Sequence, residues 1–214
     1  MKNLDVPQVN QLSIDSPLSL VSETLDTLPQ HALAETPWPT DYKTPEVRFA
    51  AAYNRDCLFL KYYVRENTVR ALYLNTNDPV YKDSCVEFFV AFDGEPQYYN
   101  LEFNSLGTCL AGFGQSREDR QLLSESAIAQ IRHAGDLQEV APDSQQVSWQ
   151  LTLAIPAAVF SGHTITDFKG TQARANFYKC GDELPEPHFV AWSPIQAPQP
   201  DFHLPAFFGG MRFI

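Results

Sequence analysis

Two strand-like runs, each with two unlike faces, constrain the fold of this chain most strongly. They cover residues 81–90 (YKDSCVEFFV) and residues 174–182 (RANFYKCGD). In both, the side chains alternate with the period of two that is typical of β-strands. Arg174, Asn176 and Tyr178 share one face of the second run, while Ala175 and Phe177 share the other. The pattern predicts a sheet with one apolar face and one polar face, which suits a polar, uncharged ligand such as a sugar.

The composition favours one β-rich domain. The chain has 214 residues, which suits a single large all-β domain. Its 15 Phe and 9 Tyr favour pleated, half-buried surfaces, and its 16 Pro and 10 Gly indicate many turns. We therefore expect one domain over residues 1–214, in which residues 1–37 form an entry segment packed on the rest.

Short alternating segments recur along the chain, and they predict an all-β fold. A helix is predicted between Ser16 and Pro29, and the main helical candidate is residues 116–134, of which 127–132 could equally be a strand. Asp93 and Gly94 predict a turn, and residues 135–146 predict a loop. Many short strands with one helical interruption indicate a jelly-roll-like β-sandwich with one or two short helical excursions. The predicted strands are 47–53, 57–64, 69–74, 84–92, 98–104, 108–113, 147–155, 174–180, 189–192 and 211–214.

The charge of the chain excludes several classes of partner. The formal net charge is −11, so phosphate backbones of nucleic acids and anionic membrane surfaces are poor partners. No apolar run approaches the roughly 20 residues that a membrane span needs. The first residues lack the apolar core of a signal peptide, which predicts a cytoplasmic protein, or a secreted one if a leader was removed. The sequence does not indicate an oligomeric state.

The four cysteines are widely spaced and include no CxxC pair, so no zinc site is expected from their spacing. Each lies in a predicted strand, which favours buried, reduced thiols. A bridge between Cys85 and Cys180 remains open at this stage. The four are Cys57, Cys85, Cys109 and Cys180.

Polar side chains also line one face of the predicted strand 98–104, where Glu102 and Asn104 follow Tyr98 and Asn100 at every second position. They are expected to join Glu87 and Asn176 on the polar sheet face, with Arg70 adding a charge. The alternative is an ordinary solvated outer face.

Aromatic and loop residues could complete a sugar site, because sugars combine apolar C–H faces with hydroxyl rims. Tyr81 and Trp192 both lie at strand ends, where an aromatic ring can be exposed, although a core position is the alternative for Trp192. Asp201 and His203 lie in the Pro-rich segment 198–205, from which they could reach the site.

Several of these segments together resemble the family 9 carbohydrate-binding modules, in their stand-alone bacterial branch. The resemblance spans about residues 30–214 and rests on residues 81–89, 99–114, 174–182, 192–194 and 200–209. It implies a β-sandwich that binds saccharides without cleaving them, in which two aromatic side chains hold a terminal sugar and polar groups bind its hydroxyls. By motif position, Tyr81 and Trp192 correspond to that pair, although family members often carry Trp where Tyr81 stands. Some members hold structural calcium, so the resemblance leaves calcium as a possible cofactor, and no other cofactor is expected. No Asp-rich calcium loop is evident in this sequence.

The leading hypothesis is therefore a non-catalytic module that binds a mono- or oligosaccharide. The main rival is a glycoside-processing enzyme that uses Glu87 and Glu102 as a carboxylate pair. A third possibility is haem binding, which needs Met or His as axial ligands of the iron. The chain has only two Met and five His, so this possibility is weak. No catalytic or metal-binding residue is assigned, and the predicted ligand-binding residues are Arg70, Tyr81, Glu87, Asn104, Asn176, Tyr178, Trp192, Asp201 and His203.

Overall fold

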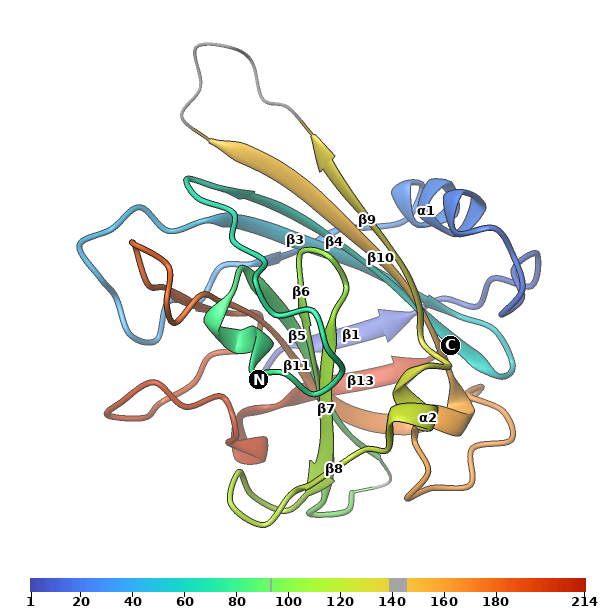
Figure 1. Ribbon diagram of the computed structural model, residues 1–214. Coiled ribbons are helices and arrows are strands. Elements are labelled where there is room, and N and C mark those ends of the chain that lie inside the picture. The colour runs from blue at the N-terminus through green and yellow to red at the C-terminus, as the bar shows by residue number, and fades with distance from the viewer. Residues whose placement is uncertain (93, 139–145) are drawn as a thin grey trace.

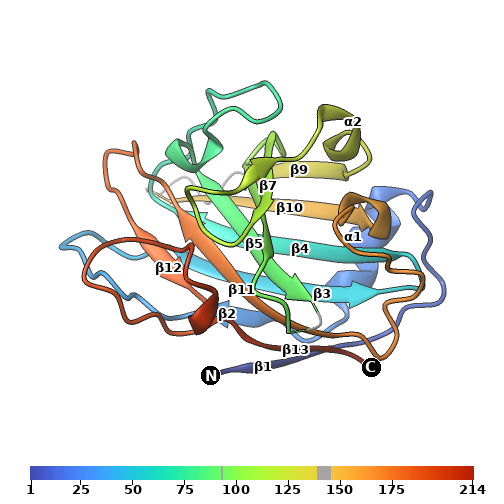
Figure 2. The same cartoon turned by 90° about the horizontal axis from the view of Figure 1, so that it is seen from below.

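The chain folds as two facing β-sheets, which confirms the predicted all-β sandwich (Figures 1 and 2). A computed structural model describes residues 1–92, 94–138 and 146–214. Asp93 of the predicted turn, and residues 139–145 of the predicted loop, lie outside the described residues.

The larger sheet carries the strands that bear the predicted polar face. Within the described residues it has eight strands, of which β1 and β13 are parallel and the other pairs antiparallel. In spatial order they are β1 (Asn3–Val6), β13 (Gly209–Phe213), β11 (Gln172–Cys180), β5 (Cys85–Phe92), β6 (Tyr98–Asn104), β7 (Cys109–Gly114) and β8 (Gln121–Leu122), with β12 (Phe189–Ala191) paired to β11.

The smaller sheet has five antiparallel strands in the described part of the chain. Their order is β2 (His31–Leu33), β3 (Glu46–Tyr53), β4 (Cys57–Glu66), β10 (Val147–Pro156) and β9 (Arg132–Gln138). Since β1 and β2 both come from the first 37 residues, that segment adds one strand to each sheet.

Aromatic side chains fill the space between the two sheets. Phe177 of β11 stacks on Phe49 of β3 at a ring-centroid distance of 3.8 Å, and on Phe88 of β5 at 5.1 Å. All three are fully buried, and burial of one such side chain contributes about 1.5–3 kcal/mol. The apolar alternation in the sequence therefore forms the inner faces of the sandwich.

Helix α1 (Leu18–Asp26) covers the outer face of the smaller sheet, as Figure 1 shows. Its residues Val21 and Leu25 are fully buried in a cluster that includes Phe59 of β4. Nζ of Lys61 lies 2.6 Å from Asp26 Oδ1. The helix predicted after Ser16 is thus confirmed.

Loops cover the outer face of the larger sheet. They include the 3-10 turns η1 (Val80–Lys82) and η3 (Pro205–Phe207), and the long connections on either side of β12. These loops on one side and the facing sheet on the other bury every residue of β5 and β6. The predicted polar face is therefore an interior surface, whose polar groups must find partners within the protein.

Two of the predicted elements are wrong, and the predicted loop 135–146 begins too early, since residues 135–138 belong to β9. Residues 116–134 do not form one helix; they form β8, the four-residue helix α2 (Glu125–Ile128) and the start of β9. Ser124 ends the irregular stretch by capping α2, where its hydroxyl accepts a hydrogen bond from Ala127 N. Residues 132–138 pair with β10, because sheet pairing satisfies their backbone groups better than a helix interrupted by Gly135 would.

Residues 69–74, predicted as a strand, form a loop, since the backbone N–H groups of Leu72 and Tyr73 donate to Asp83 Oδ2 instead of to a neighbouring strand. The remaining short turn is η2 (Ala157–Val159). The longest helix has nine residues, and no helix in the described ranges is long and apolar enough to cross a membrane.

Candidate functional site

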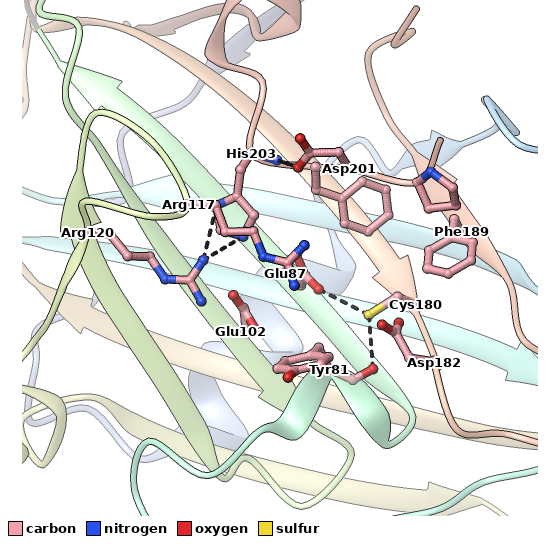
Figure 3. A pocket seen from close by; sticks show the side chains of 12 residues that line it. Tyr81, Glu87, Glu102, Arg117, Arg120, Cys180, Asp182, Phe189, Asp201 and His203 are labelled. Atoms are coloured by element: carbon pink, nitrogen blue, oxygen red, sulfur yellow. Dashed lines mark hydrogen bonds between the residues drawn. The ribbon is translucent and has the colours of Figure 1, made fainter. Parts of the chain in front are cut away.

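A small cavity opens between the covering loops and the outer face of the larger sheet (Figure 3). Its volume is about 70 Å³. Strands β5, β6 and β11 form its floor, and η1, residues 117–120 and residues 200–203 form its walls. The lining residues are Tyr81, Glu87, Glu102, Arg117, Arg120, Cys180, Asp182, Phe189, Pro200, Asp201, Phe202 and His203.

Two buried glutamates lie side by side on the floor. Glu87 of β5 and Glu102 of β6 are directly opposed cross-strand partners, exposed by only 3% and 2%. Burial raises the pKa of Glu87 well above its usual range, and the neighbouring Glu102 raises it further. Burial also raises the pKa of Glu102. At least one of the two carboxyls therefore keeps its proton near neutral pH, because two adjacent buried carboxylates repel each other.

Each glutamate has one identified polar contact. Cys180 Sγ lies 3.0 Å from Glu87 Oε1, and Asn100 Nδ2 donates to Glu102 Oε1 at 3.0 Å. Glu102 Oε2 is buried and accepts no hydrogen bond from any described residue. A buried carboxylate oxygen without a donor is costly, so the floor presents an acceptor that a ligand hydroxyl could satisfy.

Two arginines reach the cavity from a turn that Asp119 organises. Asp119 Oδ1 accepts hydrogen bonds from the backbone N–H of Ser116 and of Gln115. Arg117 and Arg120 flank this residue and line the cavity on the side away from Tyr81. The guanidinium groups supply hydrogen-bond donors beside the carboxyl acceptors.

His203 is held as a neutral ring. Arg120 Nη1 lies 2.7 Å from His203 Nε2, and the hydroxyl of Tyr98 lies 2.9 Å from Nδ1. Burial, together with the nearby Arg120, lowers the pKa of His203 to about 3. Because a guanidinium can only donate, Nε2 must accept, which places the ring proton on Nδ1 and directs it to Tyr98.

Three aromatic rings border the cavity, namely Tyr81, Phe189 and Phe202. Phe202 is held from beneath by Tyr178, whose ring stacks on it at 4.1 Å and whose hydroxyl donates to Phe202 O at 3.2 Å. Tyr178 is fully buried and does not line the cavity. It therefore supports the aromatic wall and does not itself face the opening.

The structure brings together four of the nine predicted ligand-binding residues. Tyr81, Glu87, Asp201 and His203 all line the cavity. Asp201 also shapes the wall, because its Oδ1 accepts a hydrogen bond from His203 N at 2.8 Å.

Trp192 is the clearest correction, because it is not an exposed sugar platform. Its side chain is 3% exposed and packs edge-on against Phe49 and Phe177 in the core between the sheets. A Cβ atom on Gly209 would lie only 2.6 Å from the indole ring. The backbone N–H of Trp192 bonds to Phe177 O, so the residue extends the β12–β11 pairing and its side chain turns inward.

Arg70, Asn104 and Asn176 also lie outside the cavity, because their side chains hold loops in place. Arg70 donates to the Glu183 carboxylate at 2.9 Å and to Glu183 O at 2.7 Å. Asn104 is fully buried and bonds to four groups, which are Tyr73 O, Asp83 Oδ2, Leu106 N and Thr108 N. Asn176 bonds to both the N–H and the C=O of Ser193.

Several lining residues were not predicted to bind the ligand. Arg117 and Arg120 fell in a segment predicted to be helical. Glu102 was expected on the polar sheet face, but it was given a role only in the enzymatic alternative. Cys180 and Phe189 are end residues of predicted strands, Asp182 follows one, and Pro200 and Phe202 belong to the Pro-rich segment 198–205. The proximity of Asp201 and His203 to Pro200 and Phe202 was the one usable signal in the sequence, since all four belong to one Pro-rich loop.

Comparisons with known proteins agree with the observed architecture. The model of carbohydrate-binding family 9 matches residues 20–213. A search of curated proteins finds no match. The crystal structure of a candidate carbohydrate-binding protein from Bacteroides uniformis is 35% identical, with a TM-score of 0.91 over 100% of this chain and 99% of that one.

Two structures of a family 9 module from Caldicellulosiruptor kristjanssonii share the fold at 12% identity. One, in complex with glucose, has a TM-score of 0.60 over 100% of this chain and 96% of that one. The other, in complex with cellotriose, has a TM-score of 0.61 over 99% and 93%. Since the family model covers nearly the whole sandwich, this chain belongs to carbohydrate-binding family 9.

Proposed function

We propose that the cavity on the larger sheet binds one residue of a mono- or oligosaccharide, without cleaving it. Membership of a carbohydrate-binding family supports this function. The choice of site rests on one observation. Carboxyl, guanidinium and aromatic groups surround one opening in the loops that cover the sheet.

The polar groups suit the hydroxyls of a sugar. Each sugar hydroxyl donates one hydrogen bond and accepts others, so it is best matched by acceptors and donors that lie side by side. Glu102 Oε2 is a buried acceptor without an identified donor, and Arg117 and Arg120 supply donors nearby. A sugar would therefore satisfy groups that the protein alone leaves unsatisfied.

The aromatic groups suit the apolar faces of the sugar ring. Tyr81 stands on the side of the cavity opposite Asp201 and His203 in Figure 3, where a ring could stack on the C–H face of a sugar. Phe189 and Phe202 provide further apolar contact in place of the Trp192 ring. Glucose and short glucose oligomers are the first ligands to test, because related modules have been solved with glucose and cellotriose.

Calorimetry with glucose, cellobiose and cellotriose, followed by a wider glycan screen, tests the proposal. Tyr81→Ala should weaken binding of whichever sugar binds by about fivefold or more, since stacking contributes on the order of 1 kcal/mol. Tyr42→Ala is the matched control, because Tyr42 is an exposed tyrosine that does not line the cavity. Equal affinity of both folded variants and the parent protein would refute the assignment of this site.

Glycoside hydrolysis by Glu87 and Glu102 is the alternative, and no comparison supports it. Burial does raise the pKa of both carboxyls, which is a property that a general acid requires. Incubation with the bound oligosaccharide decides between the two functions. Release of reducing sugar that disappears in Glu102→Gln would establish an enzyme, whereas an intact ligand agrees with binding alone.

A further inference from the structure

We propose that Cys85, Cys180 and Glu87 form a binding site for a thiophilic divalent cation, such as Zn²⁺, at the back of the cavity. One sulfur from each cysteine and one carboxylate oxygen lie within 4.8 Å of one another. Among the residues that the structure describes, no other group of three His, Cys, Asp or Glu side chains comes together in this way.

The sheet register creates this cluster from residues that are far apart in sequence. Cys85 begins β5 and Cys180 ends β11, and the two are directly opposed in the antiparallel pair. Glu87 lies two residues beyond Cys85, so its side chain points to the same face of the sheet. Its Oε1 atom is 3.0 Å from Cys180 Sγ, as the dashed line in Figure 3 shows.

The donor set and its spacing suit zinc. Zinc binds thiolates at about 2.3 Å and carboxylate oxygens at about 2.0–2.2 Å, usually in a tetrahedron. Two sulfurs on one tetrahedral zinc ion are therefore about 3.8 Å apart, a spacing that falls within the 4.8 Å limit that the donor atoms of the cluster already meet. Two thiolates and one carboxylate also favour a soft cation over Mg²⁺ or Ca²⁺.

The fourth coordination position would face the cavity. Cys180 and Glu87 both line the cavity, which gives the ion a path from solvent, whereas Cys85 is fully buried behind them. Glu102, the cross-strand partner of Glu87, lines the same space and has a buried Oε2 atom that no described residue bonds. That oxygen could accept a hydrogen bond from a water molecule on the metal, as outer groups do at known zinc sites.

Charge limits how tightly the ion is held. The bound cation would displace the two thiol protons and any proton on Glu87, which pass to solvent. The 2+ ion would then have three anionic ligands, namely two thiolates and one carboxylate. The remaining charge of −1 would lie beside the guanidinium groups of Arg117 and Arg120, which line the same cavity together with the carboxyls of Glu102 and Asp182. Desolvation of these groups favours the protonated, metal-free state, so we expect a reversible site.

Titration of the purified, reduced full chain with Cd²⁺ tests the proposal, because thiolate-to-cadmium charge transfer gives an ultraviolet absorption band. We expect one equivalent of Cd²⁺ to produce the band, and Zn²⁺ to compete for the same site. Cys180→Ser and Cys85→Ser should each lower Cd²⁺ affinity at least about tenfold, while Cys57→Ser should match the parent protein. Cys57 is an equally buried cysteine that packs below α1, on the other sheet.

A second measurement uses the unaltered protein, in case the serine variants fold poorly. Anomalous diffraction from a crystal soaked in Zn²⁺ should place one peak between Cys85, Cys180 and Glu87. Absence of both the band and the peak would overturn the proposal, as would equal Cd²⁺ affinity in a folded Cys180→Ser variant. A count of two free thiols instead of four in the denatured, unreduced protein would also overturn it, because a Cys85–Cys180 disulfide would then occupy the site.

Discussion

Nη1 of Arg120 lies 2.7 Å from Nε2 of His203, although the two residues are 83 positions apart in the chain. The contact joins the turn after β7 to the loop before η3 across the cavity. Tyr98 bonds the other ring nitrogen of His203, so the ring is fixed on both sides. One charged hydrogen bond thus joins two walls of the cavity.

Arg120→Ala should therefore weaken sugar binding by about tenfold, because a hydrogen bond to a charged group contributes about 1.5–3 kcal/mol and the variant also releases His203. Calorimetry with the best ligand measures the change. Arg65→Ala is the control, since Arg65 is an exposed arginine of β4 on the other sheet. Unchanged affinity in a folded Arg120→Ala variant would contradict the role given to this pair.

Trp192→Ala should destabilise the fold by about 3–5 kcal/mol, which is the usual cost of emptying an aromatic site in a core. The ring packs between the sheets against Phe49 and Phe177, so nothing nearby can fill the space without moving. Urea denaturation measures the loss of free energy of unfolding. Tyr81→Ala is the comparison, because that side chain borders the cavity. An equal loss of unfolding free energy in both variants would contradict the placement of Trp192 in the core and of Tyr81 at the cavity.

Asn104→Ala should lower the free energy of unfolding by at least about 1–3 kcal/mol. The substitution removes the hydrogen bonds that Asn104 makes to Tyr73 O, Leu106 N and Thr108 N, and one of the three hydrogen bonds that Asp83 Oδ2 accepts, and each lost hydrogen bond lowers stability. Asn10→Ala, at an exposed position, serves as the matched control. The role of Asn104 would be refuted if urea denaturation gave the same midpoint for both variants.

Stability should fall as the solution is acidified, in part through His188. Its Nε2 accepts from Lys179 Nζ at 2.8 Å, its Nδ1 donates to Glu186 O at 3.0 Å, and Nε2 also lies 3.6 Å from Glu66 Oε2. Burial, together with Lys179, lowers the pKa of His188 to about 3. Because the unfolded chain binds this proton below about pH 6.5 and the folded protein does not, stability rises with pH between those two values.

The contribution of His188 should be complete above about pH 6.5, and about 2 kcal/mol of it should be lost at pH 5. His188→Gln retains a hydrogen-bonding side chain but cannot titrate, so its unfolding free energy should fall less steeply with acid. Urea denaturation at pH 7.5 and pH 5 compares the two proteins. Parallel changes in both would show that His188 does not titrate in this way.

The sequence alone determined the architecture, because the inner faces of a sandwich are set by local alternation. Phe49, Phe88 and Phe177 stand at period-two positions, and burying them requires two sheets face to face. The helix after Ser16 was readable for the same reason, since Val21 and Leu25 lie one turn apart on one apolar stripe. The family resemblance rests on these same segments, and the family model covers residues 20–213.

Tertiary structure decided the identity of the site. The alternation placed Glu87, Asn176 and Tyr178 on one face, but no local signal indicated that loops would bury that face and separate lining residues from supporting ones. Trp192 lies inward because β12 pairs with β11, and Arg120 reaches the cavity because its turn meets His203. Cys85 and Cys180 meet only through strand register. Contacts of this kind join distant parts of the chain, so their geometry is fixed by packing and pairing and not by the pattern of any one segment.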